Sequence, residues 1–300
     1  MKTVFQGIIN IVSYINQHPL AKKHKYHSYR QFIRWQLSQF ISPGEKIVPF
    51  TSKTFLAVNK GMTGATGNIY LGLHEFNDMG FLLHFLREKD VFFDIGSNIG
   101  SYTILASGHC KANSIAFEPI TAAFNALLKN IEINNLQNLV IAKNIGISDS
   151  ENILTFTTSM DTVNHVTDPS ENLSHVTNIA VYPGDYFLKD LGCPCLIKID
   201  VEGYEDWVIR GIPLILKNEY LKAIIIELNG SGYKYGVNEM EIHQNLKKLN
   251  FNPYSYDPFK RKLTLLNLYG TTNTIYIKDL EFVQNRINNA DKVKLFSENF

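Results

Sequence analysis

One segment decides how this chain folds: Val91-Phe92-Phe93-Asp94-Ile95-Gly96-Ser97-Asn98-Ile99-Gly100. Its first residues form a short apolar run, which is typical of a buried strand, and a helical pattern follows the second glycine. Glycines at such a turn let the backbone approach a ligand closely, and a helix amino terminus can offer N–H groups to a carboxylate or phosphate. The segment therefore predicts a strand–turn–helix unit with a ligand at the turn.

The glycine spacing bears on the kind of ligand. The dinucleotide fingerprint requires G-x-G-x-x-G and the phosphate loop requires G-x-x-x-x-G-K-[ST], and the segment contains neither. Asp94 stands at the mouth of the turn, where a carboxylate would repel a pyrophosphate but would suit an ammonium group. The pattern D-x-G-x-N-x-G thus favours a zwitterionic, amino-acid-bearing cofactor over a dinucleotide.

Apolar runs alternate with helical patterns on either side of this segment. The runs that read as buried strands are residues 91–94, 114–117, 139–142, 196–199 and 223–228. Such an alternation indicates an α/β sheet, mostly parallel, with helices on both faces. Two features depart from it: residues 157–183 form a polar excursion or hairpin beside the sheet, and residues 263–268 and 274–277 read as a closing antiparallel pair.

The alternating core covers residues 80–278, with 79 residues before it and 22 after it. Residues 1–79 predict two helices and then short strands and turns over residues 46–73. The sequence contains no long flexible linker, so we expect one catalytic domain with an amino-terminal elaboration on the substrate side. Residues 279–300 are expected to form a carboxyl-terminal tail.

Acidic residues follow three of the predicted strands. Glu118 lies 24 residues after Asp94, where a carboxylate can accept both hydroxyls of a ribose. A ribose and a zwitterion together suggest S-adenosylmethionine. In the stretch Leu196-Ile197-Lys198-Ile199-Asp200-Val201-Glu202-Gly203-Tyr204-Glu205, Asp200 and Glu202 should face the same cleft as Gly96, because ligands of open α/β sheets bind beyond the carboxyl ends of the strands. Glu227 ends the next strand.

Together these motifs resemble the FkbM-type methyltransferases over roughly residues 68–277. The matching stretches are Asp94–Gly100, Phe117-Glu118-Pro119, Asn144–Asp149, Lys198–Glu205 and Ile226-Glu227. Ser97 departs from the family, which commonly has another small residue, alanine, at this position. The resemblance implies a class I, Rossmann-like fold with a seven-stranded sheet in the order 3-2-1-4-5-7-6, strand 7 antiparallel. It also implies transfer of a methyl group from S-adenosylmethionine to a hydroxyl of a carbohydrate or small metabolite.

The resemblance and the chemistry of the residues assign provisional roles. The methionine moiety of the cofactor is expected at Asp94, Gly96, Asn98 and Gly100, the ribose at Glu118 and the adenine beside Asn144, and Ser97 and Pro119 are also expected to contact the cofactor. Asp200 and Glu202 are candidates for the general base or for positioning the acceptor, and Glu227 is the third. We predict no resident metal, although Asp200, Glu227 and Asn229 could form an oxygen-ligand site. N-methylation and a non-catalytic cofactor-binding module remain alternatives.

Composition limits the partners. With 29 Lys and Arg against 28 Asp and Glu, the formal net charge is +1, which removes the usual electrostatic reason to expect nucleic acid and favours a small or carbohydrate acceptor. Three cysteines without a secretion signal suggest a reducing, cytoplasmic setting. Apolar residues at helical spacing between Val4 and Ile15 predict an amphipathic helix docked on the core, with a membrane-surface helix as the alternative. The aromatic residues from Tyr26 to Phe50 are expected to pack in the core.

Overall fold

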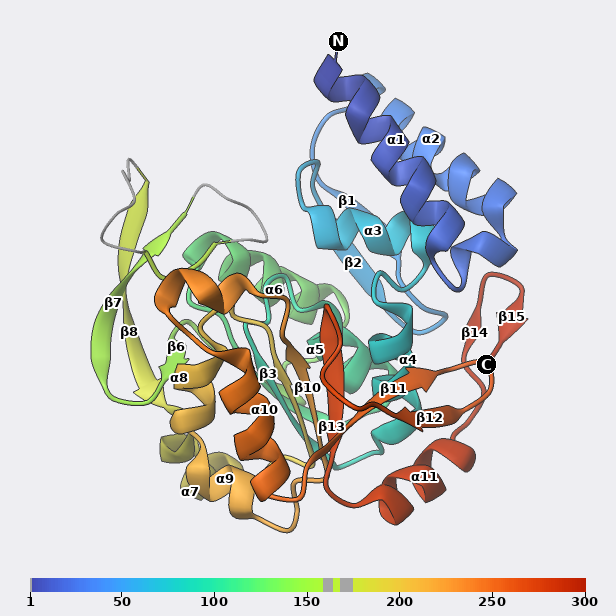
Figure 1. Cartoon of the computed structure of the whole chain (residues 1–300). Helices are drawn as coiled ribbons and strands as arrows, with labels where there is room; N and C mark the ends of the chain where they lie inside the picture. Colours follow the sequence, from blue (N-terminus) through green and yellow to red (C-terminus); the bar gives the residue numbers. More distant parts are fainter. Residues whose placement is uncertain (1, 159–163, 168–174) are drawn as a thin grey trace.

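The computed structural model describes residues 2–158, 164–167 and 175–300. Its centre is an eight-stranded sheet with the strand order β12-β11-β13-β10-β9-β3-β4-β5 (Figure 1). The five parallel strands are β3 (Val91–Ile95), β4 (Asn113–Phe117), β5 (Val140–Lys143), β9 (Leu196–Ile199) and β10 (Ala223–Glu227). Apolar runs form these strands because both of their faces are covered.

The strand order confirms the predicted topology and adds one strand. Read from β5 to β11 (Asn252–Asp257), the sheet has the order 3-2-1-4-5-7-6, and its seventh strand, β13 (Asn273–Ile277), is antiparallel to β10. The eighth strand, β12 (Lys262–Leu265), pairs with β11 at the edge. The prediction that residues 263–268 pair with residues 274–277 was therefore wrong, because β11 lies between them.

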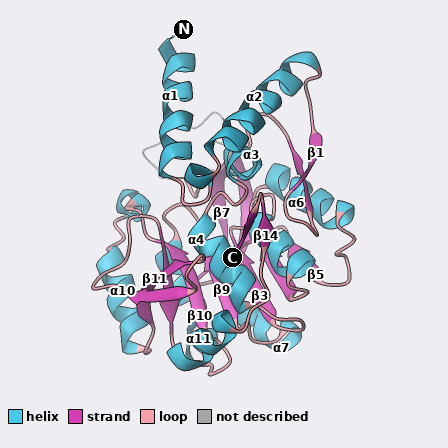
Figure 2. Cartoon of the chain, turned by 90° about the vertical axis from the view of Figure 1, so that its right-hand side faces the viewer, coloured by secondary structure: helices cyan, strands magenta, loops and turns pink. Residues whose placement is uncertain are grey.

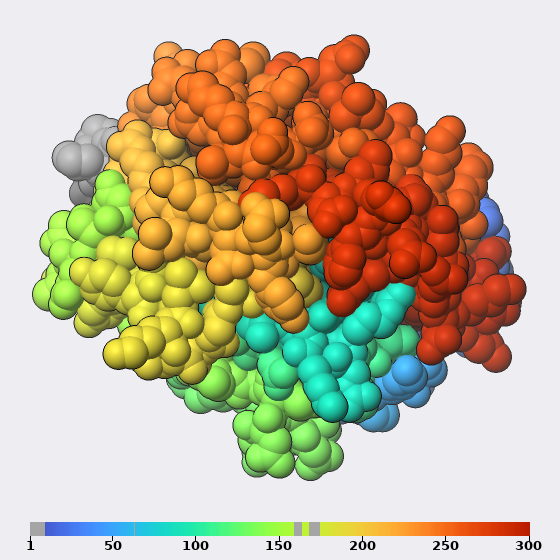
Figure 3. Space-filling model, turned by 90° about the horizontal axis from the view of Figure 1, so that it is seen from below, coloured from blue at the N-terminus to red at the C-terminus, as the bar shows by residue number. Residues whose placement is uncertain are grey.

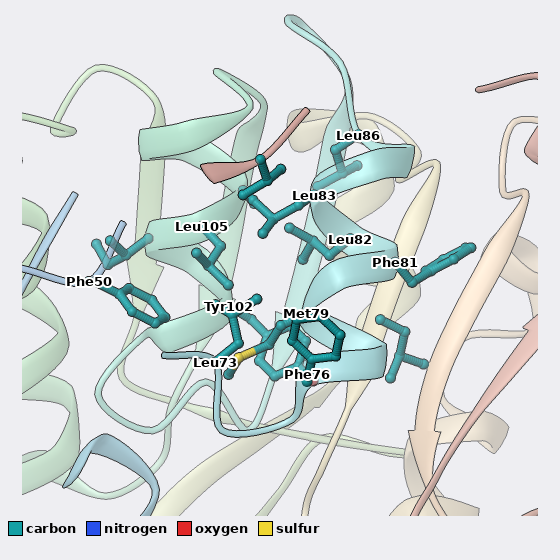
Figure 4. Close-up of a cluster of buried hydrophobic side chains, with 14 of the residues drawn as sticks. Phe50, Leu73, Phe76, Met79, Phe81, Leu82, Leu83, Leu86, Tyr102 and Leu105 are labelled. Atoms are coloured by element: carbon teal, nitrogen blue, oxygen red, sulfur yellow. The ribbon is translucent and has the colours of Figure 1, made fainter. Parts of the chain in front are cut away.

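Two apolar layers cover the sheet. One contains α4 (Phe76–Phe85), α5 (Ser101–Ile104), α6 (Thr121–Ile133) and α11 (Leu280–Asn288), and Figure 4 shows α4 side chains such as Leu82 facing Leu105, which directly follows α5. The other contains α8 (Glu205–Arg210), α9 (Pro213–Lys217) and α10 (Glu239–Lys248), with the short α7 (Leu188–Leu191) at its margin. Successive strand residues alternate between the layers, as Phe92 and Phe93 do. Figure 3 shows α10, α11 and the α7–α9 segment together on the face opposite the chain's amino terminus.

The amino-terminal elaboration begins with two helices that project from the body of the molecule, α1 (Lys2–Gln17) and α2 (Lys25–Ile41) (Figures 1 and 2). They are followed by the hairpin of β1 (Lys46–Pro49) and β2 (Phe55–Val58). Short strands and turns were expected up to Leu73, but α3 occupies Thr63–Leu71 despite its glycines. Glycine has a low helix propensity, but the packing of α3 requires it at this position, because a Cβ at Gly67 would lie 2.2 Å from Nδ1 of His74.

The terminal regions share the core of the central domain. Ile15 of α1, Trp35 of α2 and Phe300 belong to the same buried cluster as α4. The boundary expected between residues 79 and 80 falls inside α4, and the expected tail forms α11 and a small hairpin of β14 (Lys294–Leu295) and β15 (Glu298–Asn299). No helix in the described part of the chain is long and apolar enough to cross a bilayer.

The polar excursion forms a separate small sheet beside β5. This sheet has the order β6-β8-β7 and consists of β6 (Gly146–Ser148), β7 (Asn152–Thr157) and β8 (Val176–Pro183). β7 and β8 pair antiparallel as a hairpin, which begins earlier than the predicted range of residues 157–183 because β7 starts at Asn152. The rest of the predicted excursion, residues 159–163 and 168–174, lies outside the described residues.

Candidate active site

A cavity of about 270 Å³ lies beyond the carboxyl ends of β3, β4, β9 and β10. Part of its wall comes from the amino-terminal elaboration, through Gly64, Ala65 and Asn68 of α3, and through His74 and Glu75 before α4. The predicted site residues that line it are Asp94, Gly96, Ser97, Asn98, Glu118, Pro119, Asp200, Glu202 and Glu227. Parallel strands bring these distant segments together, because their carboxyl ends meet at one edge.

The glycine turn after β3 is fixed by a close approach to β9. Gly96 has φ +78°, and a Cβ there would lie 1.8 Å from the carbonyl oxygen of Asp200. Every backbone N–H from Gly96 to Gly100 already donates within the protein; for example, Gly96 donates to the Phe117 carbonyl over 3.0 Å and Asn98 to Oε2 of Glu118 over 2.7 Å. The expected supply of N–H groups for a ligand is therefore absent from these five residues. At Gly96 the turn contributes a tight part of the cavity wall that carries no side chain.

We expect Gly96→Ala to destabilise the fold by about 3 kcal/mol or more, because the new methyl group must push β3 away from β9. Gly236→Ala is the matched control: Gly236 has φ +72°, but its Cβ would meet nothing within 4 Å, so only backbone strain of about 1 kcal/mol is added. Urea unfolding measures both losses. Equal losses in the two variants would show that the contact with Asp200 is unimportant.

Two buried carboxyl groups support the glycine turn. Asp94 accepts hydrogen bonds at Oδ2 from the backbone N–H (3.0 Å) and the hydroxyl (2.6 Å) of Thr103, which ties the end of β3 to α5. Glu118 accepts N–H groups from Asn98 and from Ile120 (2.8 Å), one on each oxygen. Burial raises the pKa of Asp94 to about 6 and that of Glu118 to about 7. Each Glu118 oxygen keeps a second lone pair that a ribose hydroxyl could use.

Two predicted cofactor residues do not line the cavity. Gly100 precedes α5 and packs against Leu127, to which its Cβ would come within 2.4 Å. Asn144 donates its side-chain amide to the carbonyls of Glu118 (2.8 Å) and Pro119 (2.9 Å), so it fixes the loop that carries Glu118. The neighbouring Ile145 lines the cavity instead.

Three carboxylates gather at the ends of β9 and β10. Oxygen atoms of Asp200, Glu202 and Glu227 lie within 4.8 Å of one another, and all three side chains are half-buried. Burial and the negative charge of Asp200 raise the pKa of Glu202 to about 7 and that of Glu227 to about 9. Asn229, the predicted third oxygen ligand, is exposed and accepts the N–H of Ser231. Glu202 therefore replaces Asn229 in this cluster.

A lysine that the sequence analysis did not single out lies beneath these carboxylates. Lys198 is 3% exposed, and its Nζ donates to Oδ2 of Asp200 over 2.6 Å and lies 4.8 Å from the ring centroid of Tyr102. Burial alone would lower the pKa of Lys198, but the nearby charges of Asp200, Glu75 and Asp94 raise it above its ordinary value. The only feature of the sequence that could have indicated a role for Lys198 is that a charged residue lies inside an apolar strand.

Glu205, the remaining acidic residue of this motif, stabilises the turn that follows Asp200. Glu202 adopts φ +54° and Gly203 φ +102°, and a Cβ at Gly203 would lie 2.7 Å from the carbonyl oxygen of Ser231. Oε1 of Glu205 accepts the N–H of Gly203 over 3.1 Å and closes this turn from inside. Burial raises the pKa of Glu205 to about 7. Glu205 is therefore a structural carboxyl that holds Glu202 at the cavity.

Comparison with known proteins identifies the family. The model of the methyltransferase FkbM domain matches residues 94–253, which contain the glycine turn, Glu118 and all three clustered carboxylates. The chain belongs to this family. The FkbM family comprises methyltransferases that use S-adenosylmethionine as methyl donor, which agrees with the resemblance of the motifs.

This FkbM-family chain is similar to one curated protein and to several solved structures. It is 31% identical over 150 residues to the hexuronic acid methyltransferase AglP of Haloferax volcanii, a match that covers 49% of this chain and 59% of AglP. Solved structures with a related arrangement include a precorrin-6y C5,15-methyltransferase of Geobacter metallireducens (TM-score 0.41, 13% identity, 74% of this chain and 93% of that one). Another is TrmK of M. capricolum in complex with S-adenosyl-homocysteine (TM-score 0.37, 14% identity, 67% and 68%).

Proposed function

We propose that this FkbM-family methyltransferase methylates a hydroxyl group of a carbohydrate. The observation that carries the proposal is the position of Asp200, whose backbone touches the glycine turn while its side chain belongs to the carboxylate cluster. S-adenosylmethionine, held along the turn and at Glu118, supplies the electrophilic methyl group. An alcohol needs a general base to become nucleophilic, and a carboxylate beside the methyl donor can accept its proton.

The charge of the cluster favours a hydroxyl over a carboxylate as the methyl acceptor. Three carboxyl groups and Glu75 face one buried cation, Lys198, so an acceptor carboxylate in the same place would add a further negative charge. A neutral hydroxyl avoids this repulsion and can donate a hydrogen bond to Asp200. A sugar as the carrier of the hydroxyl is supported by AglP, whose name states that it methylates a hexuronic acid.

We assign the binding of the adenine and the acceptor, and the transfer of the proton, to residues that line the cavity. We place the adenine near Ile145 and the acceptor between the carboxylate cluster and the wall formed by α3, His74 and Glu75. In this arrangement residues 1–79 form the substrate side of the cavity. Asp200 orients the hydroxyl and takes its proton, Glu202 assists, and Glu227, whose pKa is about 9, carries a proton at neutral pH and shares a hydrogen bond with Asp200.

Methyl transfer can be measured with labelled S-adenosylmethionine and two glycan pools, one containing hexuronic acids and one of neutral sugars. We expect label in a glycan, in a form that survives mild alkali, because a methyl ether is stable there and a methyl ester is not. Heat-denatured protein is the control. Alkali-labile label would mean that a carboxylate is the acceptor, label on nitrogen would mean N-methylation, and cofactor binding without transfer to any acceptor would favour a binding module.

A further inference from the structure

The projecting helix α2 carries an apolar stripe on its exposed side. Tyr26, Phe40 and Ile41 are 82%, 84% and 79% exposed, and Ile33 and Leu37 are more than half exposed. With 3.6 residues per turn, all of these except Ile41 fall within an arc of about 60°. The opposite side of the same helix carries its buried residues, Ser28, Trp35 and Gln39.

This stripe corrects the expectation that the aromatic residues of this region pack in the core. Trp35 and Phe50 are buried, but Tyr26 and Phe40 are among the most exposed large side chains in the described part of the chain. Contiguous exposed apolar residues on a projecting element mark an interaction surface. The stripe lies on α2, not on α1, the helix for which a membrane contact was considered.

The amino-terminal segment that contains the stripe carries charges of one sign only. Residues 1–44 contain six cations, Lys2, Lys22, Lys23, Lys25, Arg30 and Arg34, and no Asp or Glu. The other 23 cations therefore accompany all 28 acidic residues, which gives residues 45–300 a formal charge of −5. Arg30 and Arg34 are exposed and flank the stripe along one side of α2.

We propose that α2 lies in the surface of an anionic lipid bilayer, with the apolar stripe among the acyl chains and the basic residues at the headgroups. Exposed apolar and cationic residues on one helix are the two features that bind such surfaces. A second copy of the chain fits less well, because a symmetric contact through α2 would bring together two segments that carry cations and no acidic residue.

The surface is connected to the proposed active site. α3 contacts α2, with Phe32 and Tyr70 packed edge to face at 5.3 Å, and α3 also contributes Gly64, Ala65 and Asn68 to the cavity wall. A bilayer bound along α2 would thus lie on the same side of the molecule as the proposed acceptor side of the cavity. The binding surface does not depend on the proposed reaction.

The test is co-sedimentation of the full chain with vesicles of phosphatidylcholine, with and without phosphatidylglycerol. We expect binding to the anionic vesicles only, released by high salt. Phe40→Asp combined with Ile41→Asp should lower the partition coefficient at least about tenfold. Arg30→Gln and Arg34→Gln should each lower it about fivefold. Ile153→Asp, at an exposed apolar residue of β7, is the matched control and should bind like the unchanged chain.

Because all the substituted residues are exposed, the variants should keep their fold, which unaltered binding of S-adenosylmethionine would verify. The proposal is overturned if the unchanged chain does not bind anionic vesicles, or if Phe40→Asp with Ile41→Asp binds them equally well. It is also overturned if the unchanged chain is a dimer that does not bind vesicles and these substitutions make it a monomer.

Discussion

Asp200→Asn is expected to lower kcat by about 100- to 10,000-fold while S-adenosylmethionine binds with an affinity within about twofold of the original. The amide keeps the size of the side chain but cannot accept a proton from the acceptor hydroxyl. Asp200 is the clustered carboxylate whose backbone lies against the glycine turn, so it is the one that we place next to the methyl group. Turnover of a glycan acceptor and calorimetry with the cofactor measure the two effects.

A matched control is available in the same sheet. Asp257 also ends a strand, β11, but does not line the cavity, so Asp257→Asn should leave kcat within about twofold. If Asp200→Asn retains full turnover, the proton acceptor is Glu202 or Glu227, and Glu202→Gln tests the first of these. The pKa of Glu202 is about 7, so a base at this position would make kcat rise with pH through neutrality.

The grouping of the residues that we assign to the cofactor was largely predictable from the sequence, because each follows a strand of the same sheet. Asp94, Gly96 and Glu118 follow apolar runs at strand ends, and the carboxyl ends of parallel strands meet at one edge. The structure places these residues around one cavity as the pattern required. The direction of the Asn144 side chain was not predictable from its position in the motif, because its amide donates to the carbonyls of Glu118 and Pro119.

The proposed acceptor side could not be predicted from the sequence, because it depends on packing between distant segments. Glu75 reaches the site only because α3 and α4 lie over the carboxyl ends of the strands, and it accepts a hydrogen bond from Asn273, almost 200 residues later. The exposure of the apolar stripe on α2 could not be predicted from the sequence for a related reason. Helical spacing shows that apolar residues share a face, but it does not show whether another element covers that face.

Lys198 was overlooked because a strand buried on both faces has little alternation to identify a functional side chain. We expect Lys198→Met to destabilise the protein by about 3–5 kcal/mol at neutral pH, because it leaves the buried carboxylates without their cation. Lys222→Met is the matched control: Lys222 pairs with Asp279 at 2.9 Å, in a more exposed pair outside the cavity, so the loss should stay below about 1 kcal/mol.

The stability lost in Lys198→Met should depend on pH, in a direction set by the protonation of Glu202 and Glu227. The pKa of Lys198 is raised, so its own stabilising contribution is present throughout the range below its ordinary value of 10.5. The pKa values of Glu202 and Glu227 are raised from 4.5 to about 7 and about 9, so the folded state holds more protons than the unfolded state. Their contribution to stability is therefore present below pH 4.5 and decreases as pH rises through 7 and 9.

Without Lys198 these carboxyl groups should hold their protons more tightly, which predicts a steeper decrease of stability between about pH 5 and about pH 8 than in the unchanged protein. For the same reason the acidic limb of the pH–rate profile should move to higher pH, by about 1. Urea unfolding at the two pH values and kcat against pH measure these effects, with Lys222→Met alongside. A stability loss that is the same at both pH values, with an unmoved pH–rate profile, would mean that Lys198 only fills space beneath the cluster. A steeper loss together with a moved profile would show that its charge sets the protonation of Glu202 and Glu227.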